Sequence, residues 1–119
     1  MAVSPEETAA HLRFRAEKHL GAMAEMAAHA RVAAEAAARL LMQKFGASAV
    51  WLFGSVVSGK VHPSSDVDLV VEGLSIDALD AARATLEGLD SPFPFELLTM
   101  ESLNPAFRGR ILQLGVRLL

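Results

Sequence analysis

The chain of 119 residues contains no cysteine, which excludes disulfide bonds and thiolate metal sites and fits a reducing compartment. It has no apolar run near the roughly 20 residues that a membrane-spanning helix needs. Its N-terminus also lacks the basic start and apolar core of a secretory signal. The net charge is -3, whereas a surface that binds nucleic acid broadly is normally basic. We therefore expect a cytoplasmic protein with no membrane segment and no nucleic-acid partner.

The N-terminal part of the chain is dominated by helix-forming residues. Residues 6–44 contain no proline and consist mostly of Ala, Leu, Met, Glu and Arg, all strong helix formers. Ser4 is placed to cap the start of this helix, and Gly46 is placed to end it. A single helix of this length would extend about 60 Å, which is more than a small domain can cover. We expect it either to break near Gly21 or to protrude and pack on another chain.

An apolar stripe with heptad spacing follows this helix. Its alanine-rich middle would let two helix backbones approach closely, so a homo-oligomer through the N-terminal helix is one interpretation. Packing against the sheet of its own domain is the other, and we favour it. The stripe consists of Leu20, Met23, Ala27, Ala30, Ala34, Ala37 and Leu41.

Beyond residue 45, short apolar runs alternate with turn residues. Ser75 is placed to cap one helix and Asn104 to cap another. The second of these carries Phe107, Ile111 and Leu114 at the spacing of one helical face. The expected elements are strands at about 49–53, 66–72, 93–98 and 116–119, and helices between residues 75 and 88 and between 104 and 115.

Aromatic and basic side chains near these elements are expected to be structural. Trp51 and Phe53 lie two apart on the first strand and therefore share a face, where we expect them to belong to the core. Arg108 and Arg110 on the last helix are expected to face solvent.

The most informative segment joins the first two strands. The first apolar run ends at Gly54, a polar loop follows, and the second run carries Asp66 and Asp68. Side chains two apart on a strand point to the same face. Like charges so placed are unfavourable without a cation, and hard oxygen ligands suit magnesium. The pair therefore predicts a divalent metal that holds a triphosphate.

The spacing of this segment resembles the signature of the nucleotidyltransferases of the DNA polymerase beta superfamily. Because the chain is short, it is most similar to the minimal nucleotidyltransferases (MNT), which are often paired with HEPN partners. The resemblance covers about Phe45 to the C-terminus. The residues that carry it are Gly54-Ser55, Gly59 and Ser65-Asp66-Val67-Asp68-Leu69.

The resemblance implies an α/β (α+β) fold, the nucleotidyltransferase palm, in which helices flank a small mixed sheet of three to four strands. We expect a single domain over residues 1–119, with a helical segment at 1–44 and the catalytic core at 45–119. With 52% hydrophobic residues, a chain of this size can bury a core.

The resemblance also implies roles for particular residues. Asp66, Asp68 and a third carboxylate would bind catalytic Mg²⁺, with two ions expected. The third position is Glu96 here, where the family usually has Asp, and it would also act as general base. Lys60 could replace an Arg that many relatives carry where this chain has Ser58. The residues expected to bind the nucleotide are Gly54, Ser55, Gly59, Lys60 and Ser65.

The expected function is the magnesium-dependent transfer of a nucleoside monophosphate, AMP from ATP, to a hydroxyl group. The chain has no room for a domain that grips an acceptor, so a partner protein fits, and the resemblance implies a HEPN toxin whose antitoxin is this chain. Two alternatives stay open. The chain could neutralise a toxin by contact with a weak or lost catalytic site, or it could be a small-molecule nucleotidyltransferase of the antibiotic-modifying type.

Overall fold

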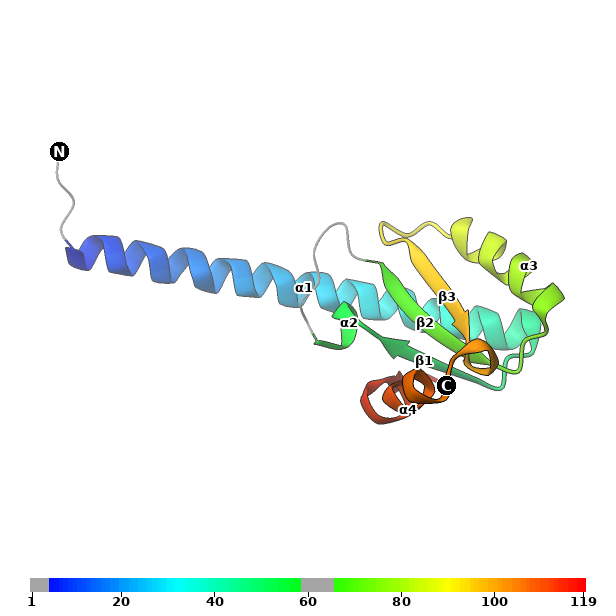
Figure 1. Cartoon of the computed structure of the whole chain (residues 1–119). Helices are drawn as coiled ribbons and strands as arrows, with labels where there is room; N and C mark the ends of the chain where they lie inside the picture. The colour runs from blue at the N-terminus through cyan, green and yellow to red at the C-terminus, as the bar shows by residue number, and fades with distance from the viewer. Residues whose placement is uncertain (1–4, 59–65) are drawn as a thin grey trace.

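The computed structural model describes residues 5–58 and 66–119, with the side chains of residues 21–58 and 66–119 except those of Met23, Ser55 and Ser58. Four helices, four strands and a short 3-10 helix follow one another along the described chain (Figure 1). The predicted order of long elements is confirmed, while the four-residue helix α2 and the 3-10 helix η1 were not expected. The elements are α1 (Pro5–Phe45), β1 (Ala49–Phe53), α2 (Ser55–Ser58), β2 (Val67–Glu72), α3 (Ile76–Glu87), β3 (Phe95–Thr99), η1 (Met100–Ser102), α4 (Pro105–Leu114) and β4 (Val116–Arg117).

Helix α1 is a single helix of 41 residues. It passes through Gly21 without a break, so the break considered there is wrong; the helix protrudes, and its packing on another chain stays a prediction. The N-terminal half extends well beyond the sheet (Figure 1), and the molecule reaches 66 Å along its longest axis. Gly46 ends the helix as predicted: its φ of 71° suits glycine, and its N–H donates to the carbonyl oxygen of Met42 at 3.1 Å.

The four strands form one mixed sheet in the order β3-β2-β1-β4. Strand β1 is antiparallel to β2 and to β4, whereas β2 and β3 are parallel. The α+β fold class and the mixed sheet are therefore confirmed. In this register Asp68 of β2 lies between Phe53 of β1 and Glu96 of β3.

One face of the sheet is covered by α1 and α3 (Figure 1). Alternate side chains of β1 and β2 point toward these helices, as the period of two requires. The C-terminal part of the apolar stripe packs there, so its own sheet is the partner from Ala30 onward. The side chains of Leu20 and Met23 lie outside the described residues, and an oligomer through them stays a prediction. The buried residues of this layer include Ala30, Ala34, Ala37, Leu41, Val50, Leu52, Val67, Leu69, Val71, Ala82 and Leu86.

Within residues 5–58 and 66–119, the opposite face of the sheet is covered only in part. Helix α4 and η1 pack there on a smaller cluster that includes Trp51, Val70, Met100 and Ile111, which confirms Trp51 as a core residue. The predicted caps hold α3 and α4 in place. Ser75 Oγ accepts from the Ala78 N–H at 3.2 Å and Asn104 Oδ1 accepts from the Phe107 N–H at 2.8 Å. Within residues 5–58 and 66–119, no helix combines the length and apolarity of a membrane span.

Replacing Gly21 tests the continuity of α1. A Cβ at Gly21 would meet no atom within 4 Å, and alanine is favoured over glycine inside a helix by about 1 kcal/mol. Gly21→Ala should therefore increase the helical circular dichroism signal at 222 nm, whereas Gly21→Pro should reduce it. If neither variant changed that signal, the chain would not be helical through this position.

Candidate metal and nucleotide site

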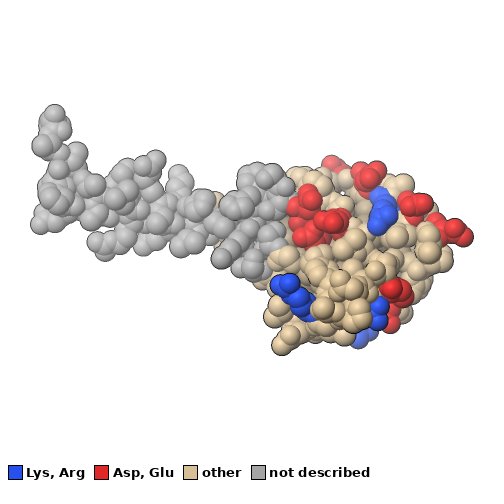
Figure 2. Space-filling model, in the orientation of Figure 1, with Lys and Arg blue, Asp and Glu red and all other residues tan. Residues whose placement is uncertain are grey.

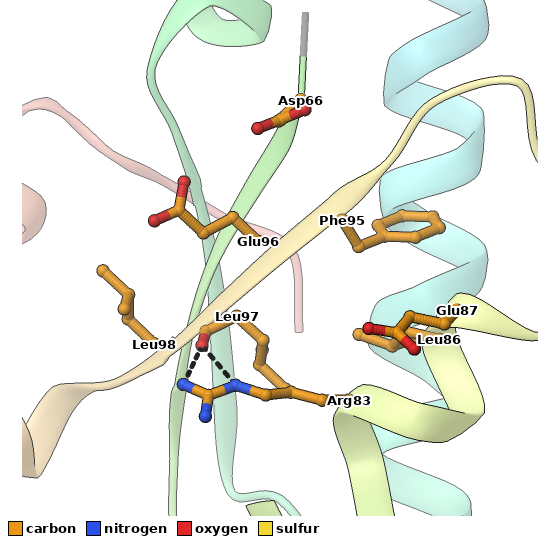
Figure 3. Close-up of a pocket in the computed structure, with 8 residues that line it drawn as sticks. All are labelled: Asp66, Arg83, Leu86, Glu87, Phe95, Glu96, Leu97 and Leu98. Atoms are coloured by element: carbon orange, nitrogen blue, oxygen red, sulfur yellow. Dashed lines mark hydrogen bonds between the residues drawn. The ribbon is translucent and has the colours of Figure 1, made fainter. Parts of the chain in front are cut away.

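Three carboxylates meet on the open face of the sheet because of the register between β2 and β3. Asp68 and Glu96 are direct neighbours across the parallel pair, and Asp66 precedes Asp68 by two residues, so all three share a face. One oxygen atom from each lies within 4.8 Å of the others. Figure 2 shows acidic side chains gathered where β2 and β3 begin. In Figure 3, Asp66 and Glu96 lie on one side of this strand pair and Phe95 on the other.

Glycine is required at position 54 for two reasons. Its φ of 81° lies in the left-handed region that side chains disfavour. A Cβ at Gly54 would also collide with the Asp68 Oδ2 atom. The turn that joins β1 to α2 therefore presses directly against the central carboxylate of the cluster.

The cluster is electrostatically unfavourable on its own. The pKa of Asp68 is raised from 3.8 to about 6, first because the carboxyl group is partly buried, and then because it is hydrogen-bonded to Glu96 and lies near the negative charges of Glu96 and Asp66. A nearby cation would favour the charged form instead. The donors that the described residues offer here are three carboxylates, and oxygen ligands of this kind fit a hard divalent ion such as Mg²⁺.

The other residues predicted to bind the nucleotide are placed only in part. Gly54 lines the site, and Ser55 is the first residue of α2, although its side chain lies outside the described residues. Gly59, Lys60 and Ser65 also lie outside them. Their contacts with phosphate stay predictions.

Two pockets flank the carboxylate cluster. The first, here called the edge groove, has a volume of about 360 Å³ and runs along β3, with Asp66 and Glu96 on one side and Arg83 and Glu87 on the other (Figure 3). Arg83 donates from Nε at 3.3 Å and from Nη2 at 2.9 Å to the carbonyl oxygen of Leu97. Its guanidinium group is therefore hydrogen-bonded to a backbone carbonyl of β3, an edge strand of the sheet.

The second pocket, here called the α4 pocket, has a volume of about 440 Å³ and lies on the β1 side of the cluster. Phe107, Ile111 and Leu114 line it together, which confirms their predicted common face. Arg110 lines it as well and is exposed to solvent, as expected. Arg108 differs from the expectation, because it is partly buried and donates from Nη2 to the carbonyl oxygen of Leu103 at 3.0 Å. The full lining is Phe53, Gly54, Val57, Phe107, Arg110, Ile111 and Leu114.

A mixed sheet that gathers three carboxylates beside a glycine turn defines a nucleotidyltransferase palm. Residues 35–119 match the family model described as polymerase beta, nucleotidyltransferase. The chain belongs to this nucleotidyltransferase family, as the sequence resemblance indicated. No curated protein sequence matches the chain at a significant level.

Solved structures give the same fold. A proposed minimal nucleotidyltransferase is 28% identical with a TM-score of 0.60, and the match covers 72% of this chain and 89% of that one. A toxin–antitoxin structure with AMP-PNP is 24% identical with a TM-score of 0.59, covering 71% and 72%. A mutant of the toxin–antitoxin MntA-HpeT is 22% identical with a TM-score of 0.55, covering 68% and 67%. At these identities the two toxin–antitoxin structures support the fold alone.

Replacing Gly54 should disrupt both the turn and the cluster. Gly54→Ala adds backbone strain of about 1–3 kcal/mol and pushes its Cβ into the Asp68 carboxylate. We expect a loss of that order in the free energy of unfolding, measured in urea, together with weaker Mg²⁺ binding. Gly109→Ala is the matched control, because a Cβ there meets no atom within 4 Å. Equal stability and equal Mg²⁺ affinity of Gly54→Ala and the parent would contradict this geometry.

The raised pKa of Asp68 predicts how the metal-free protein responds to pH. The folded-state pKa of about 6 exceeds the ordinary value of 3.8. The contribution of Asp68 to the free energy of unfolding is therefore fully present below pH 4 and is lost as the pH rises through 6. Discounted for the exposed part of the carboxyl group, the loss is about 1 kcal/mol. Asp68→Asn should remove this pH-dependent contribution. In EDTA, the free energy of unfolding of the variant should therefore rise relative to that of the parent between pH 4 and pH 8.

Thermal unfolding across that pH range measures the difference between the two proteins. Adding Mg²⁺ at pH 8 should raise the melting temperature of the parent more than that of Asp68→Asn. Parallel stability profiles of the two proteins at every pH would show that Asp68 does not titrate as described.

Proposed function

We propose that this nucleotidyltransferase uses Mg²⁺ to transfer AMP from ATP to a hydroxyl group of a partner protein, and that the partner is the HEPN-type toxin of a toxin–antitoxin pair. The observation that carries the proposal is the approach of Asp66, Asp68 and Glu96 to within 4.8 Å of one another. The repulsion among these charged carboxylates would be relieved by a cation bound between them.

Each residue of the site has a role in this proposal. Asp66, Asp68 and Glu96 would hold the magnesium, which would neutralise charge on the transferred phosphoryl group. The acceptor oxygen attacks the α-phosphorus, the bond from that phosphorus to the bridging oxygen breaks, and pyrophosphate leaves. Glu96 takes the proton of the acceptor hydroxyl. The residues that hold the phosphates are Gly54, Ser55, Gly59, Lys60 and Ser65.

The open form of the site supports an acceptor that belongs to another protein. Asp66 and Glu96 are exposed, and α4 covers only part of their face of the sheet. Among the described residues no second layer closes over the cluster. Two structures with the same fold are toxin–antitoxin structures, and one of them has AMP-PNP, which agrees with a nucleotide donor and a protein acceptor.

An antitoxin that acts by contact alone is the second candidate. Glu96 stands where the family usually has Asp, and its longer side chain is the specific feature that favours weak or absent turnover. Both candidates predict a complex with the toxin, but only the first predicts a covalent product.

Labelled ATP separates the two candidates. The protein, Mg²⁺ and a HEPN-type partner are incubated with ATP labelled on the α-phosphate, and label on the partner is measured together with toxin activity. We expect labelling by the parent, none by Asp68→Asn, and a decrease of about 10²- to 10⁴-fold in Glu96→Gln. Asp80→Asn, an exposed change on α3, should label as the parent does.

The outcomes point in different directions. Loss of both label and neutralisation in Asp68→Asn supports the transferase. Neutralisation by Asp68→Asn and the parent alike, with no label in either, would instead establish the contact-only antitoxin. Labelling that continues at the parent rate in Asp68→Asn would rule out the assigned site.

A further inference from the structure

The α4 pocket adjoins the reaction centre but has no part in the chemistry described above. Gly54 lines it, and the same residue presses against Asp68 Oδ2. Phe53 also lines it and is the register neighbour of Asp68 on β1. A molecule bound in the pocket would therefore contact residues that are direct neighbours of Asp68 in the carboxylate cluster.

The lining of the α4 pocket suits a flat, largely apolar ring system. Two aromatic rings, Phe53 and Phe107, meet edge to face with centroids 6.0 Å apart and an angle of 87°. Leu114 leaves 64% of its surface exposed at the same place, so it offers an apolar wall to a bound ring. The volume of about 440 Å³ falls within the range of about 300–1,000 Å³ that is typical of small-molecule sites.

The charges of the two pockets differ in a way that separates donor from acceptor. Asp66, Glu87 and Glu96 line the edge groove, and its one arginine is bonded to a backbone carbonyl. Asp66 and Glu96 would be neutralised by the metal, but Glu87 leaves the far wall of this groove acidic and therefore unfavourable for the phosphates of a nucleotide. Among the described residues, no acidic side chain lines the α4 pocket, and Arg110 does line it, so it can admit the anionic donor.

We propose that the α4 pocket binds the nucleobase of the donor nucleotide, with its phosphates directed past Gly54 toward the carboxylates. This inference rests on the proposed function, because it assumes a nucleoside triphosphate at the cluster. The edge groove, on the Glu96 side, is then left free for the acceptor. Phe107 and Leu114 contact the base, and Arg110 lies where it can stack on the base or pair with a phosphate.

Comparing a ligand that has a base with one that lacks it tests the assignment. Isothermal titration with Mg²⁺ gives the dissociation constants of ATP and of inorganic tripolyphosphate for each variant. Leu114→Ser removes an exposed apolar wall, and Phe107→Leu removes a ring while keeping the packing of a partly buried side chain. Leu112→Ser is the matched control, because Leu112 lies on the same helix with 60% exposure but lines a different pocket.

Leu114→Ser and Phe107→Leu should each weaken ATP binding by about tenfold, in line with the loss of contacts to a stacked base. Their affinity for tripolyphosphate should stay within twofold of the parent, and Leu112→Ser should change neither ligand. Unchanged ATP affinity in both pocket variants would overturn the assignment, and slower transfer in them would then place the acceptor in the pocket. Equal weakening of both ligands would also overturn it.

The failure of this inference can be told apart from the failure of the proposed function. If the parent protein bound neither ATP nor tripolyphosphate with Mg²⁺, the nucleotide site itself would be wrong and the pocket assignment would fall with it. If the parent bound ATP and the pocket variants bound it equally well, only the pocket assignment would fall.

Discussion

Repulsion among three carboxylates is the constraint on which this structure depends. The parallel pairing of β2 with β3 fixes Glu96 beside Asp68, and the period of the strand adds Asp66 to the same face. The turn at Gly54 packs against the Asp68 carboxylate of this cluster. Without a bound cation, the crowding of the carboxylates does not stabilise the fold, since it raises the pKa of Asp68 and disfavours its charged state. The arrangement becomes favourable when a cation is bound, and this connects the fold to nucleotidyl transfer.

The division of the sheet into two faces explains how so short a chain leaves a site open. Helices α1 and α3 bury the main core on one face, and the three carboxylates lie on the other. Helix α4 covers only the part of that face that lies away from the cluster, and it forms a pocket at the boundary. In the proposed function the acceptor approaches from this face, where Asp66 and Glu96 are exposed among the described residues.

The sequence predicted most of the fold because its signals are local. Strand β1 begins at Ala49 and ends at Phe53 as expected, since turn residues bound a short apolar run. The carboxylate pair followed from the period of two. The continuity of α1 could not be predicted, because a glycine at position 21 costs only about 1 kcal/mol. The position of Glu96 and the partial burial of Arg108 depend on strand register and helix docking, which are tertiary properties.

The most direct measurement is a crystal structure of the protein grown with Mn²⁺ and a non-hydrolysable ATP analogue, with anomalous scattering recorded for the metal. The account predicts an anomalous peak bound by oxygen atoms of Asp66, Asp68 and Glu96, at about 2.0–2.2 Å, the distance typical of hard divalent ions. An analogue seated in the protein with no metal at these three residues would contradict the account. So would carboxylates turned away from one another.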